Sequence, residues 1–121
     1  MGLFKKDPAK EALKSYKKFC ALVESQAGDQ IEKEISVVND LRLINYVINY
    51  TYLGRMKGLS SGTQKIIEML FKAHARELIN ANTDVQFLRD LNVTLDADAK
   101  KDPFCVNQLS SYIDSRIGQL S

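Results

Sequence analysis

Residues 44–52 read Ile-Asn-Tyr-Val-Ile-Asn-Tyr-Thr-Tyr, and this stretch decides the fold. Like residues recur at every fourth position, and positions i and i+4 are neighbours on one face of an α-helix. Apolar side chains would cover both broad sides of this helix, while Arg42, Asn45 and Asn49 form its clear polar strip. A helix that is apolar almost all round must be covered on both sides, by other helices of its own domain or by a second chain.

The composition is that of an ordinary globular protein. The chain has 121 residues, of which 45% are hydrophobic and 26% are charged, and this balance excludes a disordered chain. No apolar run approaches the roughly 18 residues that a membrane-spanning helix needs. The length predicts one domain, residues 1–121, that folds alone.

Apolar periodicity and capping residues predict the other helices. Asp7-Pro8 and Asp102-Pro103 would open the first and last of them, because aspartate caps helices and proline suits the first helical position. We expect helices over residues 8–26, 41–57, 63–80, 84–91 and 103–120, with a further helical stretch from Asp29. The sequence leaves open whether residues 29–57 form one helix or two.

The predicted fold is all-α, a compact antiparallel bundle of four main helices plus one or two short helices. In the helix over residues 63–80, one broad apolar face carries Ile66, Ile67, Leu70, Phe71, His74 and Leu78. The inner stripe of the last helix carries Val106, Leu109, Ile113, Ile117 and Leu120. Residues 92–101 lose the periodicity and are predicted to form the longest loop.

Candidate catalytic groups are few. His74 is the only histidine and lies on an apolar stripe, which favours a packed side chain with one hydrogen bond. Cys20 and Cys105 also lie among apolar residues, and we expect both to be buried, reduced thiols. No motif places a nucleophile beside a base, so we predict no catalytic residue and no enzymatic activity.

Metal and cofactor motifs are also missing. Cys20, His74 and Cys105 lack the short spacings of a zinc site. Asp96, Asp98 and Asp102 invite comparison with a calcium loop, but lysines stand where that loop needs an oxygen ligand and a glycine. The glycines do not form a phosphate-binding loop either. We therefore predict no metal and no cofactor.

The excess of apolar residues on the central helix favours protein contacts. Tyrosines with apolar bodies and polar tips are typical of interfaces. We interpret the chain as a non-enzymatic interaction or regulatory module that binds a protein partner or forms a homodimer, with Tyr46, Tyr50, Leu53 and Met56 as the contact face. The alternative, that this face belongs to the internal core, remains open.

Lysines gather on one flank of the first helix: Lys6, Lys10, Lys14, Lys17 and Lys18. Charge on a helix flank is usually solvated. The alternative function for this flank is nucleic-acid binding, and a weaker alternative is a membrane surface with Leu3 and Phe4 as an anchor. The N-terminus lacks the apolar core of a signal peptide, so we expect a cytoplasmic protein.

Overall fold

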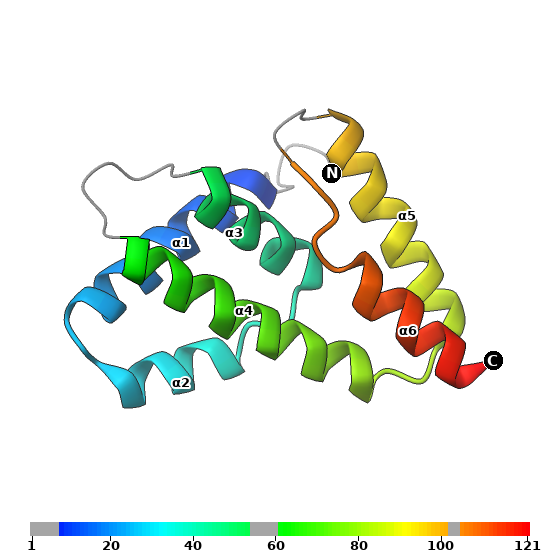
Figure 1. Ribbon diagram of the computed structural model, residues 1–121, viewed down its shortest axis with the longest axis horizontal. Coiled ribbons are helices and arrows are strands. Elements are labelled where there is room, and N and C mark those ends of the chain that lie inside the picture. Colours follow the sequence, from blue (N-terminus) through cyan, green and yellow to red (C-terminus); the bar gives the residue numbers. More distant parts are fainter. Residues whose placement is uncertain (1–7, 54–60, 102–104) are drawn as a thin grey trace, which may run out of the picture.

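The computed structural model describes residues 8–53, 61–101 and 105–121. These residues form six helices and no strand: α1 (Pro8–Glu24), α2 (Gly28–Ser36), α3 (Leu41–Leu53), α4 (Ser61–Ala81), α5 (Val85–Lys101) and α6 (Ser110–Leu120). The helices pack against one another, and α5 and α6 lie side by side (Figure 1). The all-α bundle prediction is confirmed. The predicted caps Asp7 and Asp102 lie outside the described residues.

α3 is central to the packing, since it lies against both α1 and α4. Its side chains Ile44, Val47 and Ile48 are fully buried, which contributes about 1.5–3 kcal/mol for each. Tyr50, on the opposite broad side, is buried as well, and its ring centroid lies 6.0 Å from that of Tyr16 in α1. The chain's own helices therefore cover residues that the sequence pattern left open to a partner.

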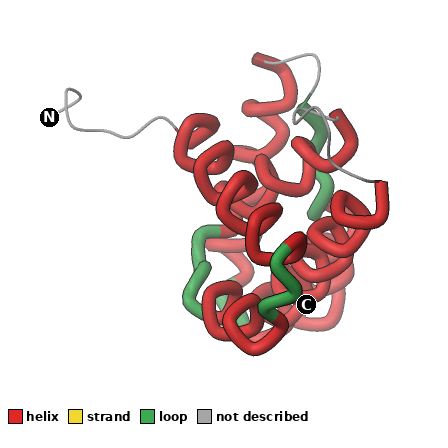
Figure 2. The backbone as a smooth tube through the Cα atoms, turned by 90° about the vertical axis from the view of Figure 1, so that its left-hand side faces the viewer, coloured by secondary structure: helices red, strands yellow, loops and turns green. Residues whose placement is uncertain are grey.

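Short described connections join α1 to α2, α2 to α3 and α4 to α5 (Figure 2). After α1, Gln26 adopts a left-handed φ of 59°, and the Ala27 N–H donates to the Leu22 carbonyl at 3.1 Å. These are the features of a helix-ending motif in which the residue with the left-handed conformation, here Gln26, is usually glycine. Gly28 follows and begins α2.

Within residues 29–57, the described part, 29–53, belongs to two helices rather than one. The Asp40 carboxylate accepts hydrogen bonds from the N–H groups of Arg42 at 3.0 Å and Leu43 at 3.3 Å. It thereby satisfies two of the donors that the first turn of α3 leaves without a helical partner. Asp40 thus starts α3 as a helix separate from α2.

The predicted loop at residues 92–101 is wrong, because these residues form the second half of α5. The inner face of α5 carries Leu88, Leu95 and Asp98, all of them buried. An aspartate on the inner face interrupts the apolar period from which a helix is read. The helix continues because Asp98 has a partner on α3, which the local sequence does not reveal.

The last helix begins at Ser110, later than predicted. Residues 105–109, here called the connector, lead into it without helical structure. Leu109 and Ile113 are buried as expected, but Val106, predicted on the inner stripe, is exposed. Side chains of α3 hold the connector, and the Asn107 Oδ1 atom accepts the Leu109 N–H at 3.1 Å.

One polar atom of the core is poorly satisfied. The Tyr16 hydroxyl is buried, and the group beside it is the Cys20 thiol, a weak hydrogen-bonding group; no other described side chain or backbone group bonds to this hydroxyl. Burial, and then Cys20, raise the pKa of Tyr16 to about 12. A buried hydroxyl without a partner costs free energy that the folded state must offset.

Tyr16→Phe should therefore raise the free energy of unfolding by about 1 kcal/mol, because it removes the unsatisfied hydroxyl and keeps the ring. Urea unfolding followed by circular dichroism measures the change. Tyr50→Phe is the matched control: the Tyr50 hydroxyl donates to the Ala9 carbonyl at 2.8 Å, so its loss should destabilise the protein. A Tyr16→Phe protein less stable than wild type by more than 1 kcal/mol would contradict this account.

Candidate functional site

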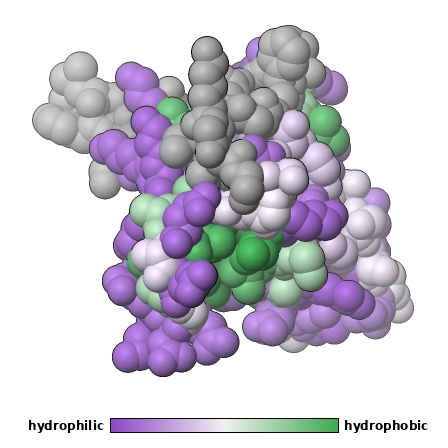
Figure 3. Space-filling view, turned by 60° about the vertical axis from the view of Figure 1, so that its left-hand side comes forward, coloured by the Kyte–Doolittle hydropathy of each residue, from purple (hydrophilic) through white to green (hydrophobic). Residues whose placement is uncertain are grey.

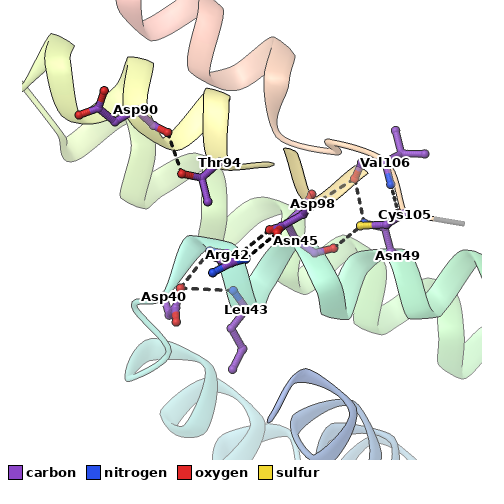
Figure 4. Close-up of polar contacts among 10 residues, drawn as sticks. All are labelled: Asp40, Arg42, Leu43, Asn45, Asn49, Asp90, Thr94, Asp98, Cys105 and Val106. Carbon is purple, nitrogen blue, oxygen red and sulfur yellow. Dashed lines mark hydrogen bonds and ion pairs between the residues drawn. The ribbon is translucent and has the colours of Figure 1, made fainter. Parts of the chain in front are cut away.

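The polar strip of α3 does not face solvent. Asn45 and Asn49 are buried, and Arg42 is half-buried. All three side chains point toward the C-terminal part of the chain, where α5 ends and the connector passes (Figure 4). The strip therefore joins segments far apart in the sequence.

The two asparagines bind the backbone of the connector. Asn49 Nδ2 donates to the Val106 carbonyl at 2.9 Å, and Asn49 Oδ1 accepts the Val106 N–H at 3.1 Å. Asn45 Oδ1 accepts the Gln108 N–H at 2.8 Å, and Asn45 Nδ2 donates to the Val106 carbonyl at 3.2 Å. A side-chain amide offers the same donor and acceptor as a peptide group, so this asparagine clamp satisfies the backbone as a neighbouring strand would.

Arg42 and Asp98 form a bidentate ion pair beside the clamp. The distances are 2.7 Å from Nε to Oδ2 and 2.6 Å from Nη2 to Oδ1. The Asp98 side chain is 2% exposed, whereas that of Arg42 is 37% exposed. The hydrogen bond to Asp98 raises the pKa of Arg42. The pair links the last turn of α5 to the first turn of α3, and it explains how a carboxylate is tolerated in the core.

Tyr46 and Cys105 complete this cluster. Burial, and then the nearby Asp98 carboxylate, raise the pKa of Tyr46 to about 12, so its hydroxyl remains protonated at neutral pH. Asn49 Nδ2 also lies 3.5 Å from the Cys105 sulfur, which is buried. The described groups of this cluster hold α3, α5 and the connector together, and they do not assemble a nucleophile with a base.

The predicted contact face divides between core and undescribed residues. Tyr50 is buried, and its hydroxyl bonds to the backbone of α1. Tyr46 is half-buried in the cluster described above. Met56 and the side chain of Leu53 lie outside the described residues. A role of these residues in partner contacts stays a prediction, and Tyr50 would need a rearrangement of α1 to reach a partner.

His74 and the cysteines lie where the sequence predicted. His74 is half-buried, and its Nε2 atom lies 2.7 Å from the Val38 carbonyl, to which it donates. Cys20 and Cys105 are buried free thiols, and burial raises the pKa of Cys20. Across the described ranges, no group of three or more His, Cys, Asp or Glu side chains could hold a metal ion.

The basic flank of α1 faces solvent. Lys10, Lys14 and Lys17 are exposed on one side of the helix. Lys18 bonds to Glu34 of α2 at 2.6 Å, and Lys14 lies 3.9 Å from Glu11. Lys6 lies outside the described residues, as do Leu3 and Phe4.

The sequence reading missed the outer face of α4. Ile66, predicted on the inner face, is 46% exposed, and Met69 is 61% exposed. Ala73 is exposed too and follows at helical spacing, so Ile66, Met69 and Ala73 form one stripe. We call these three residues the outer stripe. The pattern was visible in the sequence as a second set of apolar residues at spacings of three and four.

Positive charge borders the outer stripe along Lys65, Lys72 and Arg76, here called the basic edge. Glu68, nearly buried, lies 3.2 Å from the Lys65 ammonium and 3.5 Å from that of Lys72. Burial by itself raises the pKa of Glu68, but hydrogen bonds from Tyr52 and Lys65 and the charge of Lys72 outweigh it and lower the pKa. The Glu68 carboxylate is therefore ionised, and side chains of the same chain supply its hydrogen bonds and counter-charge.

Two grooves lie along the basic edge. One, of about 240 Å³, is lined by Thr51, Tyr52, Ser61, Gln64, Lys65 and Glu68. The other, of about 260 Å³, is lined by Arg76, Asn80, Ser111, Tyr112, Ser115 and Gln119. Lys72 donates to the Tyr52 hydroxyl at 2.6 Å, which places this exposed tyrosine beside the edge.

None of the described helices is long and apolar enough to cross a membrane. Comparison of the chain with protein-family models, with curated proteins and with solved structures gives no match.

Proposed function

We propose that this chain is a non-enzymatic protein-interaction module that binds its partner at the outer stripe of α4. The observation that carries the proposal is the exposure of Ile66 and Met69 on one side of a helix whose other side is core. Large apolar side chains that expose much of their surface together are typical of contact sites. Ala73, as a small residue, would let a partner approach the backbone of α4 closely.

The spacing of the outer stripe supports a helical partner. Residues 66, 69 and 73 follow the alternation of three and four that lets one helix pack lengthwise against another. The opposite side of α4 buries Phe71, Ala75 and Ile79, at spacings of four, against the bundle. α4 thus has an apolar surface on two sides, and the described chain covers one of them.

The space-filling view shows hydrophobic and hydrophilic residues together on one face of the molecule. On the face that brings the α1 and α2 side forward, hydrophobic residues gather in the middle and hydrophilic residues border them (Figure 3). The evidence for the outer stripe itself is the exposure of Ile66 and Met69.

Selection from a displayed library of random peptides tests this function. Wild-type protein should enrich peptides that Met69→Asp protein no longer binds. Binding would bury the charge of the new aspartate against an apolar partner, which is unfavourable. Val93→Asp is the matched control, since Val93 is a 69% exposed residue of α5. No enrichment, or enrichment that Met69→Asp leaves unchanged, would overturn the proposal. Light scattering over a concentration series shows whether a second copy occupies the stripe.

Nucleic-acid binding by the α1 lysines is the second candidate. Lys10 and Lys17 have no carboxylate within 4.0 Å among the described residues, so their charge is available to phosphates. Phosphate contacts by three exposed lysines, Lys10, Lys14 and Lys17, would give a slope of log affinity against log salt concentration of about −2.7 for duplex DNA. Anisotropy titrations of a labelled duplex measure this slope, which Lys14→Glu should reduce and Lys33→Glu, on α2, should not. Binding that is independent of salt would exclude this candidate.

A further inference from the structure

We infer that the partner of the outer stripe is an amphipathic helix with a row of carboxylates along one flank of its apolar face. This inference rests on the proposed function and specifies its partner. Its basis is the asymmetry of charge around the stripe: cations border one side of it, and their charge exceeds that of the acids near them.

The basic edge runs parallel to the stripe. Positions 65, 72 and 76 lie four, three and seven residues from Met69, so they project on the same side of α4 as the stripe and border it. The row from Lys65 to Arg76 covers eleven residue steps, about 16 Å at 1.5 Å per residue. A partner helix of about three turns would therefore reach all three cations while its apolar side rests on Ile66 and Met69.

The edge keeps a surplus of positive charge in the folded chain. Glu68 is the single carboxylate within 4.0 Å of Lys65 and Lys72 among the described residues. Lys65 keeps a 68% exposed side chain despite that contact. The Arg76 guanidinium lies 6.0 Å from the Tyr112 ring centroid, and that interaction leaves its charge unbalanced. Carboxylates of a partner would complete the pairing.

A second copy of the chain fits this requirement less well. α4 itself exposes one acidic residue, Glu77, which lies on the opposite side of the stripe from the basic edge. In an antiparallel contact about a two-fold axis, the two basic edges would face each other. Like charges across a contact disfavour it, so the occupant we infer is a different, acidic helix.

Three synthetic helical peptides test the charge preference. They share one leucine stripe and differ in the flank, which carries glutamate, glutamine or lysine. Fluorescence anisotropy with wild-type protein at about 50 mM salt should show the glutamate peptide binding about tenfold more tightly than the lysine peptide, and the difference should shrink at about 500 mM salt as screening increases.

Variants of the basic edge locate the effect. Lys65→Gln combined with Arg76→Glu should abolish the preference for the glutamate peptide while the affinity for the glutamine peptide changes little. Arg89→Glu is the matched control, because Arg89 is an exposed cation of α5. Circular dichroism verifies that each variant is folded.

The outcomes separate this inference from the function on which it rests. If all three peptides bind equally through Met69, the interaction function stands and the acidic partner is overturned. If no peptide binds and library selection also fails, both are overturned. A dimer that Met69→Asp dissociates would retain the interaction function and replace the acidic helix with a second copy.

Discussion

Arg42→Ala should lower the free energy of unfolding by about 3 kcal/mol, the largest effect that we expect from one substitution. The substitution leaves the Asp98 carboxylate, whose side chain is 2% exposed, without its counter-charge and without the two short hydrogen bonds from the guanidinium. Urea unfolding of both proteins at pH 7 measures the difference. The opposite deletion, Asp98→Ala, should cost less, because the Arg42 side chain is 37% exposed and can turn to water.

The double variant Arg42→Met with Asp98→Leu separates charge from packing. Replacing both members of a buried pair by apolar residues of similar size is often neutral, so this protein should regain most of the lost stability. Lys14→Ala is the surface control, since its contact with Glu11 is long and exposed. If Arg42→Ala costs no more than Lys14→Ala, the ion pair does not hold α5 against α3.

Asn49→Ala should cost about 2–3 kcal/mol, because the Val106 N–H loses its acceptor and the Val106 carbonyl keeps only the longer bond from Asn45. Hydrogen exchange gives the specific readout. The Val106 amide, which donates to Asn49, should lose its protection, while the Gln108 amide keeps its bond to Asn45 and should lose less.

Asn80→Ala is the control for this experiment. Asn80 is an exposed asparagine of α4, and its removal should change the free energy of unfolding by less than about 0.5 kcal/mol. Equal exchange of the Val106 amide in wild-type and Asn49→Ala protein would show that the clamp does not hold the connector in solution.

The helical class was predictable because local patterns carry it. The tetrad repeat of residues 44–52 and the cap at Asp40 both reflect interactions between near neighbours in sequence. The second half of α5 was not predictable, since Asp98 looks like a loop residue until its partner on α3 is known. The late start of α6 has the same origin, because the clamp acts across more than fifty residues.

The candidate site shows the same division. Asn45 and Asn49 were predicted only as part of a polar strip on an otherwise apolar helix, and they are among the most buried of the described residues. Conversely, Ile66 belonged to an apolar pattern too wide for one face, and the pattern could not show which part the bundle covers. Periodicity identifies faces, and only packing decides which face is inside.

The asparagine clamp also determines which changes the connector would accept. It binds peptide groups and leaves the side chain of Val106 exposed, so it is indifferent to the identity of residue 106 but not to the number of residues that precede it. Lengthening or shortening this segment by one residue would present the wrong amides to α3. Proline is the one residue type excluded at positions 106 and 108, because it lacks the N–H that each asparagine accepts.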